Sequence, residues 1–159
     1  MGYMNTDMTW QTHTTSSTET ESLGVLLGAN LRGGEVIELI SDLGGGKTTL
    51  TRGIVRGAGS SDRVASPTFT ISREYQTPDF TIVHFDFYRL AEAGIVGDEL
   101  SEFVGDPAYV VIVEWGEVVK DVLPQKRLAV ALAQTEDMGR DVSLTLPKSL
   151  NYLIEGLKS

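Results

Sequence analysis

Apolar residues recur at helical spacing over residues 23–31, after a cluster of Thr, Ser and Glu that can cap a helix N-terminus. Two consecutive glycines end this pattern. Similar signals predict a second helix over about residues 48–57, a short helix over 98–103 and a closing helix over 149–157. The pattern therefore predicts helices spread along the whole chain.

Two short apolar runs lie between these helices, at residues 36–40 and 109–113, and each predicts a strand. The second run is rich in β-branched residues, as is typical of a buried central strand. Further signals predict strands over 128–132 and 142–146, and a loop that leads into a strand over 64–75. Strands that alternate with helices indicate an α/β protein.

Residues 80–88 form the clearest alternating segment of the chain. One set of alternate positions is apolar: Val83, Phe85 and Phe87. The other set carries polar chemistry: His84, Asp86 and Tyr88. Because successive side chains of a strand point to opposite faces, we predict one dry face and one chemically equipped face.

The N-terminal segment shows neither the helical spacing nor the strand alternation of apolar residues. Residues 1–15 are polar and poor in groups that could pack, so we expect a flexible leader before a single domain over residues 16–159. The 159 residues suffice for one domain with a sizeable core. No internal repeat or interdomain linker is visible in the sequence.

Composition narrows the class of protein. The chain has no cysteine, which excludes disulfides and cysteine-ligated zinc. No segment approaches the apolar length that spans a bilayer, so we expect a soluble, cytoplasmic protein without a membrane partner. The net charge of −9 opposes sequence-independent binding to nucleic acid. Any nucleic acid is therefore expected to be held mainly by a partner.

A glycine-rich segment follows the strand predicted at residues 36–40. Its residues are Ser41, Asp42, Leu43, Gly44, Gly45, Gly46, Lys47, Thr48 and Thr49. Consecutive glycines let backbone N–H groups point at phosphates, Lys47 adds a positive charge, and the Thr48 hydroxyl can bind Mg²⁺. A simple turn is the alternative, but a lysine at a helix N-terminus is unfavourable unless an anion binds there. We predict a phosphate-binding loop, with Ser41 where the full pattern has its first glycine.

Two carboxylates are candidates to complete this site. Glu114 ends the apolar strand, as an acid that binds Mg²⁺ or a water does, although an acid that emerges into solvent is the alternative. Asp86 is expected to position water or metal, unless it pairs with Arg89. His84 is expected to be a hydrogen-bonded buried residue rather than a base. Trp115 is expected to be a buried anchor or an interface residue.

The tripeptide Ser66-Pro67-Thr68 lies between the helix that follows the loop and the next strand. Many phosphate-loop proteins carry there a switch segment that senses the γ-phosphate. A hydroxyl beside a rigid proline suits that task, while an ordinary Ser-Pro turn is the alternative.

Together these residues resemble one family, the bacterial ATPase subunit of the tRNA threonylcarbamoyladenosine-modification complex, called TsaE. The resemblance runs from about Ser17 to Thr145 and includes Thr20 and Gly24 in the first helix. Its motifs are Asp42-Leu43-Gly44-Gly45-Gly46-Lys47-Thr48-Thr49, Thr51-Arg52-Gly53, Ser66-Pro67-Thr68-Phe69-Thr70, His84-Phe85-Asp86-Phe87-Tyr88-Arg89-Leu90 and Glu114-Trp115. In this chain Ser41 and Gly45 replace the family's usual glycine and alanine.

The resemblance implies an α/β, P-loop NTPase-like three-layer fold, with a central mixed, mostly parallel sheet flanked by helices. It implies binding of ATP and Mg²⁺ and slow ATP hydrolysis, productive with the partner subunits that transfer a threonylcarbamoyl group to the adenosine beside the tRNA anticodon. The tRNA is expected to be contacted mainly through those partners.

The resemblance also implies roles for single residues. The residues that hold the nucleotide would be Leu43, Gly44, Gly45, Gly46, Lys47, Thr48, Thr49, Arg140 and Ser17. Thr48 and Glu114 would hold Mg²⁺, while Asp86, Glu114 and Thr68 would act in hydrolysis or in sensing the γ-phosphate. The Ser41 replacement is expected to alter hydrolysis more than binding.

Other functions built on the same nucleotide core remain as alternatives. A small-molecule kinase usually needs an arginine-bearing lid, and no arginine-rich segment is visible. A GTPase would carry an Asn-Lys-x-Asp motif, which the chain lacks. A third alternative is a nucleotide-dependent interaction module whose hydrolysis is incidental.

Overall fold

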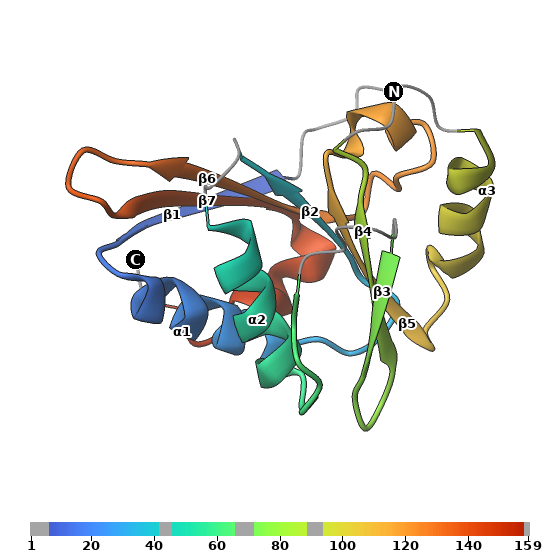
Figure 1. Ribbon diagram of the computed structural model, residues 1–159, viewed down its shortest axis with the longest axis horizontal. Coiled ribbons are helices and arrows are strands. Elements are labelled where there is room, and N and C mark those ends of the chain that lie inside the picture. Colours follow the sequence, from blue (N-terminus) through green and yellow to red (C-terminus); the bar gives the residue numbers. More distant parts are fainter. Residues whose placement is uncertain (1–6, 42–45, 66–71, 89–93, 158–159) are drawn as a thin grey trace.

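The computed structural model describes residues 7–41, 46–65, 72–88 and 94–157. Helices and strands follow one another along these residues (Figure 1). In chain order they are β1 (Asp7–Thr14), α1 (Ser17–Ala29), β2 (Val36–Ile40), α2 (Lys47–Gly57), β3 (Ser72–Gln76), β4 (Thr81–Asp86), α3 (Gly94–Phe103), β5 (Tyr109–Glu114), the 3-10 helix η1 (Gly116–Val119), β6 (Leu128–Gln134), β7 (Arg140–Pro147) and the 3-10 helix η2 (Lys148–Ile154). The strands predicted from apolar runs are all present.

The described strands form one seven-stranded sheet in the order β1-β7-β6-β2-β5-β4-β3. The central strands β6, β2, β5 and β4 are parallel neighbours. The outer pairs β1–β7, β7–β6 and β3–β4 are antiparallel. The predicted mixed sheet with a parallel centre is confirmed. Because β2, β4 and β5 are parallel, their carboxyl ends meet at one edge, which is where open α/β sheets bind ligands.

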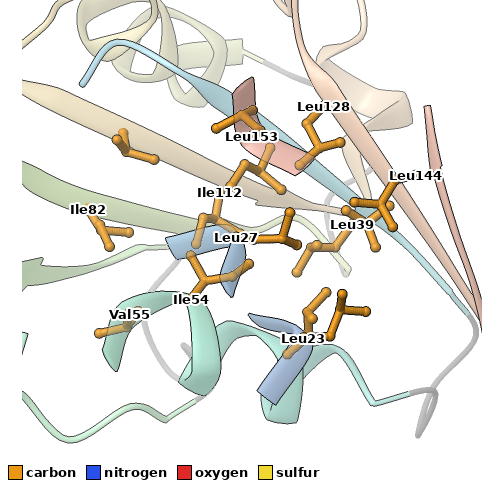
Figure 2. Packing of buried hydrophobic residues seen from close by; sticks show 14 of the residues in the cluster. Leu23, Leu27, Leu39, Ile54, Val55, Ile82, Ile112, Leu128, Leu144 and Leu153 are labelled. Carbon is orange, nitrogen blue, oxygen red and sulfur yellow. The ribbon is translucent and has the colours of Figure 1, made fainter. Parts of the chain in front are cut away.

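One face of the sheet is covered by α1, α2 and η2 (Figure 1). Figure 2 shows how side chains from the helices meet those of the strands in the larger of two cores. The labelled residues are Leu23 and Leu27 of α1, Ile54 and Val55 of α2, Leu153 of η2, and Leu39, Ile82, Ile112, Leu128 and Leu144 of the strands. All ten are buried, so this face is dry across most of the sheet.

Helices α1 and α2 contact each other through four glycines. They are Gly24 and Gly28 of α1, and Gly53 and Gly57 of α2. A Cβ added at Gly28 would lie 2.0 Å from the carbonyl oxygen of Ile54, and one at Gly53 would lie 2.1 Å from that of Glu21. Such overlaps leave no room for a side chain, so the two backbones touch directly. This contact fixes the position of α2, whose first residue is Lys47.

The other face is covered by α3 and η1 over only part of the sheet (Figure 1). A second, smaller core joins these helices to β2, β4 and β5, with Phe85, Leu100, Val113 and Val119 among its buried members. Among the described residues, this core includes none from β1, β6 or β7. The fold therefore has three layers, and the described helices leave one half of one face uncovered.

Two sequence predictions are corrected by the structure. The flexible leader expected over residues 1–15 is wrong for residues 7–14, which form β1 and pair with β7 along their whole length. Met8 and Trp10 pack against the larger core while Thr9 between them is exposed, and this burial holds the edge strand in place. Residues 1–6 lie outside the described part of the chain.

The closing helix predicted over residues 149–157 is instead η2, a 3-10 helix. Side chains three residues apart eclipse in such a helix, so Leu150 and Leu153 both reach the larger core. In the described part of the chain, no helix is both long enough and apolar enough to cross a membrane.

Candidate functional site

The carboxyl ends of β2, β4 and β5 gather polar groups at one edge of the sheet. Ser41 directly follows β2, Glu114 ends β5, and Asp86 ends β4. Asp86 lies opposite Glu114 in the register of the parallel pair, and Leu39 lies opposite Glu114 on the other side. The sequence thus brings these two acids and the segment after β2 to one place.

The N-terminus of α2 lies at the same edge. Gly46 precedes the helix with φ of 99°, a left-handed conformation that glycine adopts without strain. Lys47, Thr48 and Thr49 then form the first helical turn. The positive end of the helix dipole and the N–H groups of its first turn make such a terminus attractive to anions.

Lys47 is almost completely buried at this helix N-terminus, with 7% of its surface exposed. Its Nζ donates a hydrogen bond to the carbonyl oxygen of Ser41 at 3.2 Å and lies 4.0 Å from Glu114 Oε1. The Nζ also lies 5.1 Å from the centroid of the Trp115 ring. A buried ammonium needs such compensating groups, because desolvation is costly for a charge. The carbonyl, the carboxylate and the ring thus hold the cation at the sheet edge.

Glu114 is buried between Lys47 and His84. Its Oε2 is 2.5 Å from His84 Nε2, and 4% of its side chain is exposed. The alternative of an acid that emerges into solvent is therefore wrong, because the strand end is enclosed by its neighbours. His84 is buried and hydrogen-bonded, as expected, and within the described chain its Nδ1 is a buried nitrogen without a hydrogen-bond partner. Nothing in the sequence identified Glu114 as the partner of His84.

Asp86 is a half-buried acid next to this pair. Its Oδ1 accepts a hydrogen bond from the backbone N–H of Tyr88 at 3.0 Å. Burial, and then the nearby Glu114 carboxylate, raise the pKa of Asp86 above its usual range. A carboxyl with a raised pKa is suited to accept or hold a proton. The alternative pairing with Arg89 falls outside the described residues.

Four further predicted residues border a small cavity beside the first turn of α2. They are Ser17, Gly46, Thr49 and Arg140. The cavity measures about 250 Å³ and is also lined by Ser16 and Met138. The Arg140 Nε lies 3.3 Å from the position a Cβ would take at Gly46. The structure thus brings together residues of three distant segments, and their hydroxyls and guanidinium suit a polar ligand.

Trp115 has a backbone conformation that the sequence does not indicate. Its φ of 58° is left-handed, which is unfavourable for a residue with a bulky side chain. This turn places the ring beside Tyr88, with 5.0 Å between the ring centroids, as well as beside Lys47. Left-handed residues of this kind often occur at functional sites.

Several predicted residues cannot be placed in this geometry. Leu43, Gly44 and Gly45 of the loop and Thr68 of the proposed switch segment lie outside the described residues. Their roles stay predictions.

Comparisons with known proteins agree on one family. The family model described as threonylcarbamoyl adenosine biosynthesis protein TsaE matches residues 14–142. A tRNA threonylcarbamoyladenosine biosynthesis protein TsaE from Bacillus subtilis is 35% identical over 137 residues, which cover 83% of this chain and 82% of the relative. Its counterpart from Streptomyces coelicolor is 38% identical over 129 residues, covering 77% and 87%.

A solved structure is similar over nearly the whole chain. The crystal structure of Bacillus subtilis YdiB superposes with a TM-score of 0.75 at 32% sequence identity. The match covers 97% of this chain and 95% of the other. The similarity therefore includes β1 and the open half of the sheet as well as the edge that carries Lys47 and Glu114.

Proposed function

The chain belongs to the TsaE family, and we propose that it serves tRNA threonylcarbamoyladenosine biosynthesis as an Mg²⁺-dependent ATPase that is slow on its own. One observation carries the proposal: buried Lys47 and the N-terminus of α2 lie beside the carboxylates Glu114 and Asp86. A helix N-terminus and a lysine bind phosphates, and acids at neighbouring strand ends serve phosphoryl transfer.

Lys47 and Glu114 are already partners in the protein alone, with 4.0 Å between Nζ and Oε1. Phosphate oxygens would offer Lys47 a stronger partner, because charge-assisted hydrogen bonds to phosphate are among the strongest in proteins. We propose that Lys47 then turns toward the nucleotide, so that Glu114 becomes available to bind Mg²⁺. His84 keeps the other oxygen of Glu114 in place through its 2.5 Å contact.

The donors at this edge fit Mg²⁺. The cation binds hard oxygen ligands, and protein sites commonly supply one or two of them while waters and phosphates supply the rest. Thr48 and Glu114 would supply a hydroxyl and a carboxylate. Bound there, Mg²⁺ would neutralise charge on the phosphates.

Asp86 is proposed to orient the attacking water and to accept its proton. Its raised pKa and its position opposite Glu114 support that role. We further propose that the backbone of Leu43, Gly44 and Gly45 surrounds the phosphates and that Thr68 senses the γ-phosphate. The cavity formed with Ser17 and Arg140 would hold another part of the nucleotide.

The partners proposed for this ATPase are the threonylcarbamoyl-transferase subunits, and the proposed location is the cytoplasm. The net charge of −9 makes independent binding of tRNA unfavourable, so the tRNA would be contacted mainly through those subunits. ATP binding and hydrolysis would then switch the assembly between states.

The experiment that tests the nucleotide site is calorimetric titration of ATP with Mg²⁺. Lys47→Ala removes the buried cation, so we expect at least about tenfold weaker ATP binding. The matched control is Lys148→Ala, because Lys148 is exposed and follows β7 at the opposite edge of the sheet. The control should bind ATP as the unsubstituted chain does.

Equal ATP affinity for Lys47→Ala and the unsubstituted chain would contradict the nucleotide site. Turnover separates the proposal from the kinase alternative: ATP hydrolysis should be slow and should accelerate with the transferase subunits and tRNA. Rapid phosphorylation of a small metabolite by the isolated protein would refute the assignment.

A further inference from the structure

A groove of about 820 Å³ lies on the open half of the sheet, away from α1 and α2. Strand register explains which residues line it. Ile40 of β2 lies opposite Ala131 of β6, which lies opposite Ser143 of β7, which in turn lies opposite Gln11 of β1. These four residues form one row across the open face, and all of them line the groove.

The next row continues the same hollow. Ala133 of β6 pairs with Asp141 of β7, and Asp141 pairs with His13 of β1. Alanine is a poor strand former, yet Ala131 and Ala133 occupy consecutive positions on this face and are both exposed. Their small side chains leave the hollow that larger residues would fill.

The wall of the groove is apolar and is built from the strand ends of the proposed nucleotide site. Ile40 is 49% exposed and directly precedes Ser41, whose carbonyl holds Lys47. Trp115 lines the groove as well and directly follows Glu114. A molecule in the groove would therefore touch Ile40 and Trp115. These are the sequence neighbours of Ser41 and Glu114, which both contact Lys47.

The charged residues of the groove are mostly acidic. The carboxylates are Glu38, Glu117 and Asp141, and His13 is the basic group beside them. Within the described chain, no lysine or arginine lines the groove. Arg127 offsets Glu38 through a 3.0 Å ion pair, and His13 lies 2.9 Å from Asp141, although 68% of the Asp141 side chain is exposed. Glu117 is exposed, so it is the acidic group that most directly meets a partner.

We propose that this groove docks a segment of a partner protein that presents an apolar side chain flanked by lysine or arginine. The apolar wall and alanine floor would receive the apolar side chain, and the acidic rim would attract the cations. Nucleic acid is disfavoured because its phosphates would face these carboxylates. A second copy is disfavoured because each copy carries a net charge of −9.

Docking at this surface is coupled to the nucleotide by adjacency. Contact with Ile40 can shift Ser41, whose carbonyl accepts a hydrogen bond from Lys47. Contact with Trp115 can shift its own ring, which lies next to Lys47, and the preceding residue, Glu114. A partner bound in the groove would thus contact residues that are directly next to the Lys47 and Glu114 contacts of the proposed ATP site. This proposal rests on the proposed function for its choice of partner, the threonylcarbamoyl-transferase subunits.

Ala131→Arg tests the groove by filling its floor and opposing cationic groups. The full-length chain is titrated against purified threonylcarbamoyl-transferase subunits with ATP and Mg²⁺, and the dissociation constant is measured by interferometry. We expect at least about tenfold weaker binding, the loss typical of a disrupted interface centre. The matched control is Ala29→Arg at the exposed end of α1, on the covered side of the sheet, which should bind normally.

Two more measurements keep the test decisive. Glu117→Lys alters an exposed rim residue without filling the floor, and it should also weaken binding and reduce its salt dependence. Hydrogen exchange of the unsubstituted complex should show protection of residues 115–117, which line the groove outside the strands of the sheet. ATP affinity, measured separately, should be unchanged in every variant.

Unchanged partner binding by both Ala131→Arg and Glu117→Lys would overturn the groove as the docking site. Protection of residues 115–117 by tRNA alone, or by self-association, would also overturn it. No binding of the subunits by the unsubstituted chain would overturn the groove together with the proposed partnership. The ATP titration with Lys47→Ala would still judge the nucleotide site independently.

Discussion

The two faces of the sheet are built in opposite ways. Under one face, α1 and α2 meet backbone to backbone through four glycines and bury a core that runs across most of the strands. On the other face, α3 and η1 cover the strands around β4 and β5, while β6, β7 and β1 carry small or polar side chains. The glycine contact of the first face allows almost no change of side-chain size, and the second face has a groove that can bind another molecule.

This difference assigns different tasks to the two faces. The covered face holds α2 rigidly, and α2 carries Lys47 at its first position. The open face leads from the same strand ends to a surface where another molecule can bind. Both faces therefore meet at the edge formed by Ser41 and Glu114. The covered face holds α2 in position there, and the open face makes the same edge accessible to another molecule.

The largest expected effect comes from breaking the glycine contact of the covered face. In Gly28→Ala the added Cβ would lie 2.0 Å from the carbonyl oxygen of Ile54, so α1 and α2 must separate. We expect a loss of about 3 kcal/mol or more in the free energy of unfolding, as overpacking against backbone produces. Urea denaturation of the full chain measures it.

Gly105→Ala is the matched control for that substitution. Gly105 has φ of 82°, but an added Cβ would meet no atom of the described chain within 4 Å. The control therefore carries only the strain of a left-handed alanine, about 1–2 kcal/mol. Equal losses in the two variants would show that the helix contact is not the source of the effect.

A comparison of similar size uses one residue type on both faces. Ile54 of α2 is fully buried, while Ile40 of β2 is 49% exposed in the groove. Ile54→Ala should lower the free energy of unfolding by about 2–5 kcal/mol. Ile40→Ala should lower it by less than about 1 kcal/mol, because little buried volume is lost. Thermal and urea unfolding of both variants provides the measurement, and a larger loss for Ile40→Ala would contradict the distinction between the faces.

Much of this architecture was predictable because buried strands and amphipathic helices leave strong patterns. The strand at residues 36–40 has the same bounds in the sequence prediction and in the structure. The N-terminal strand was missed although a signal was present. Met8, Trp10 and Thr12 alternate with exposed residues, and such a period of two over a polar segment is typical of an edge strand.

The candidate site was predictable residue by residue but not as a network. Lys47, Asp86 and Glu114 were each identified, because a glycine-rich loop and acids at strand ends have recognisable sequence contexts. The contact of His84 with Glu114 joins residues thirty positions apart, and only the parallel pairing of β4 with β5 brings them together. The left-handed turn at Trp115 had no signal, since the sequence shows no glycine there.

The smallest expected effect lies on the open face, where His13 joins β1 to the β6–β7 hairpin. Its Nδ1 is 2.9 Å from Asp141 Oδ1, and its Nε2 is 3.0 Å from Asp137 Oδ2. Only the charged imidazolium can donate from both nitrogens at once. The hydrogen bonds with Asp141, and next with Asp137, therefore raise the pKa of His13 above its ordinary value.

The raised pKa gives this contact a defined pH dependence. A group whose pKa is higher in the folded state stabilises that state fully below its unfolded pKa, about 6.5 for histidine, and the contribution is lost as pH rises through the folded pKa. Asp137 stays charged across this window, since a hydrogen bond from the Thr135 hydroxyl is the main cause that lowers its pKa to about 2. The contact should thus weaken only through loss of the proton from His13.

Urea midpoints of the unsubstituted chain and of His13→Gln, measured from pH 5 to pH 9, check this expectation. The substitution should destabilise the chain slightly at pH 5, and the difference should disappear toward pH 9, because the neutral histidine no longer donates to both acids. Two curves that stay parallel over the whole range would refute the charged contact.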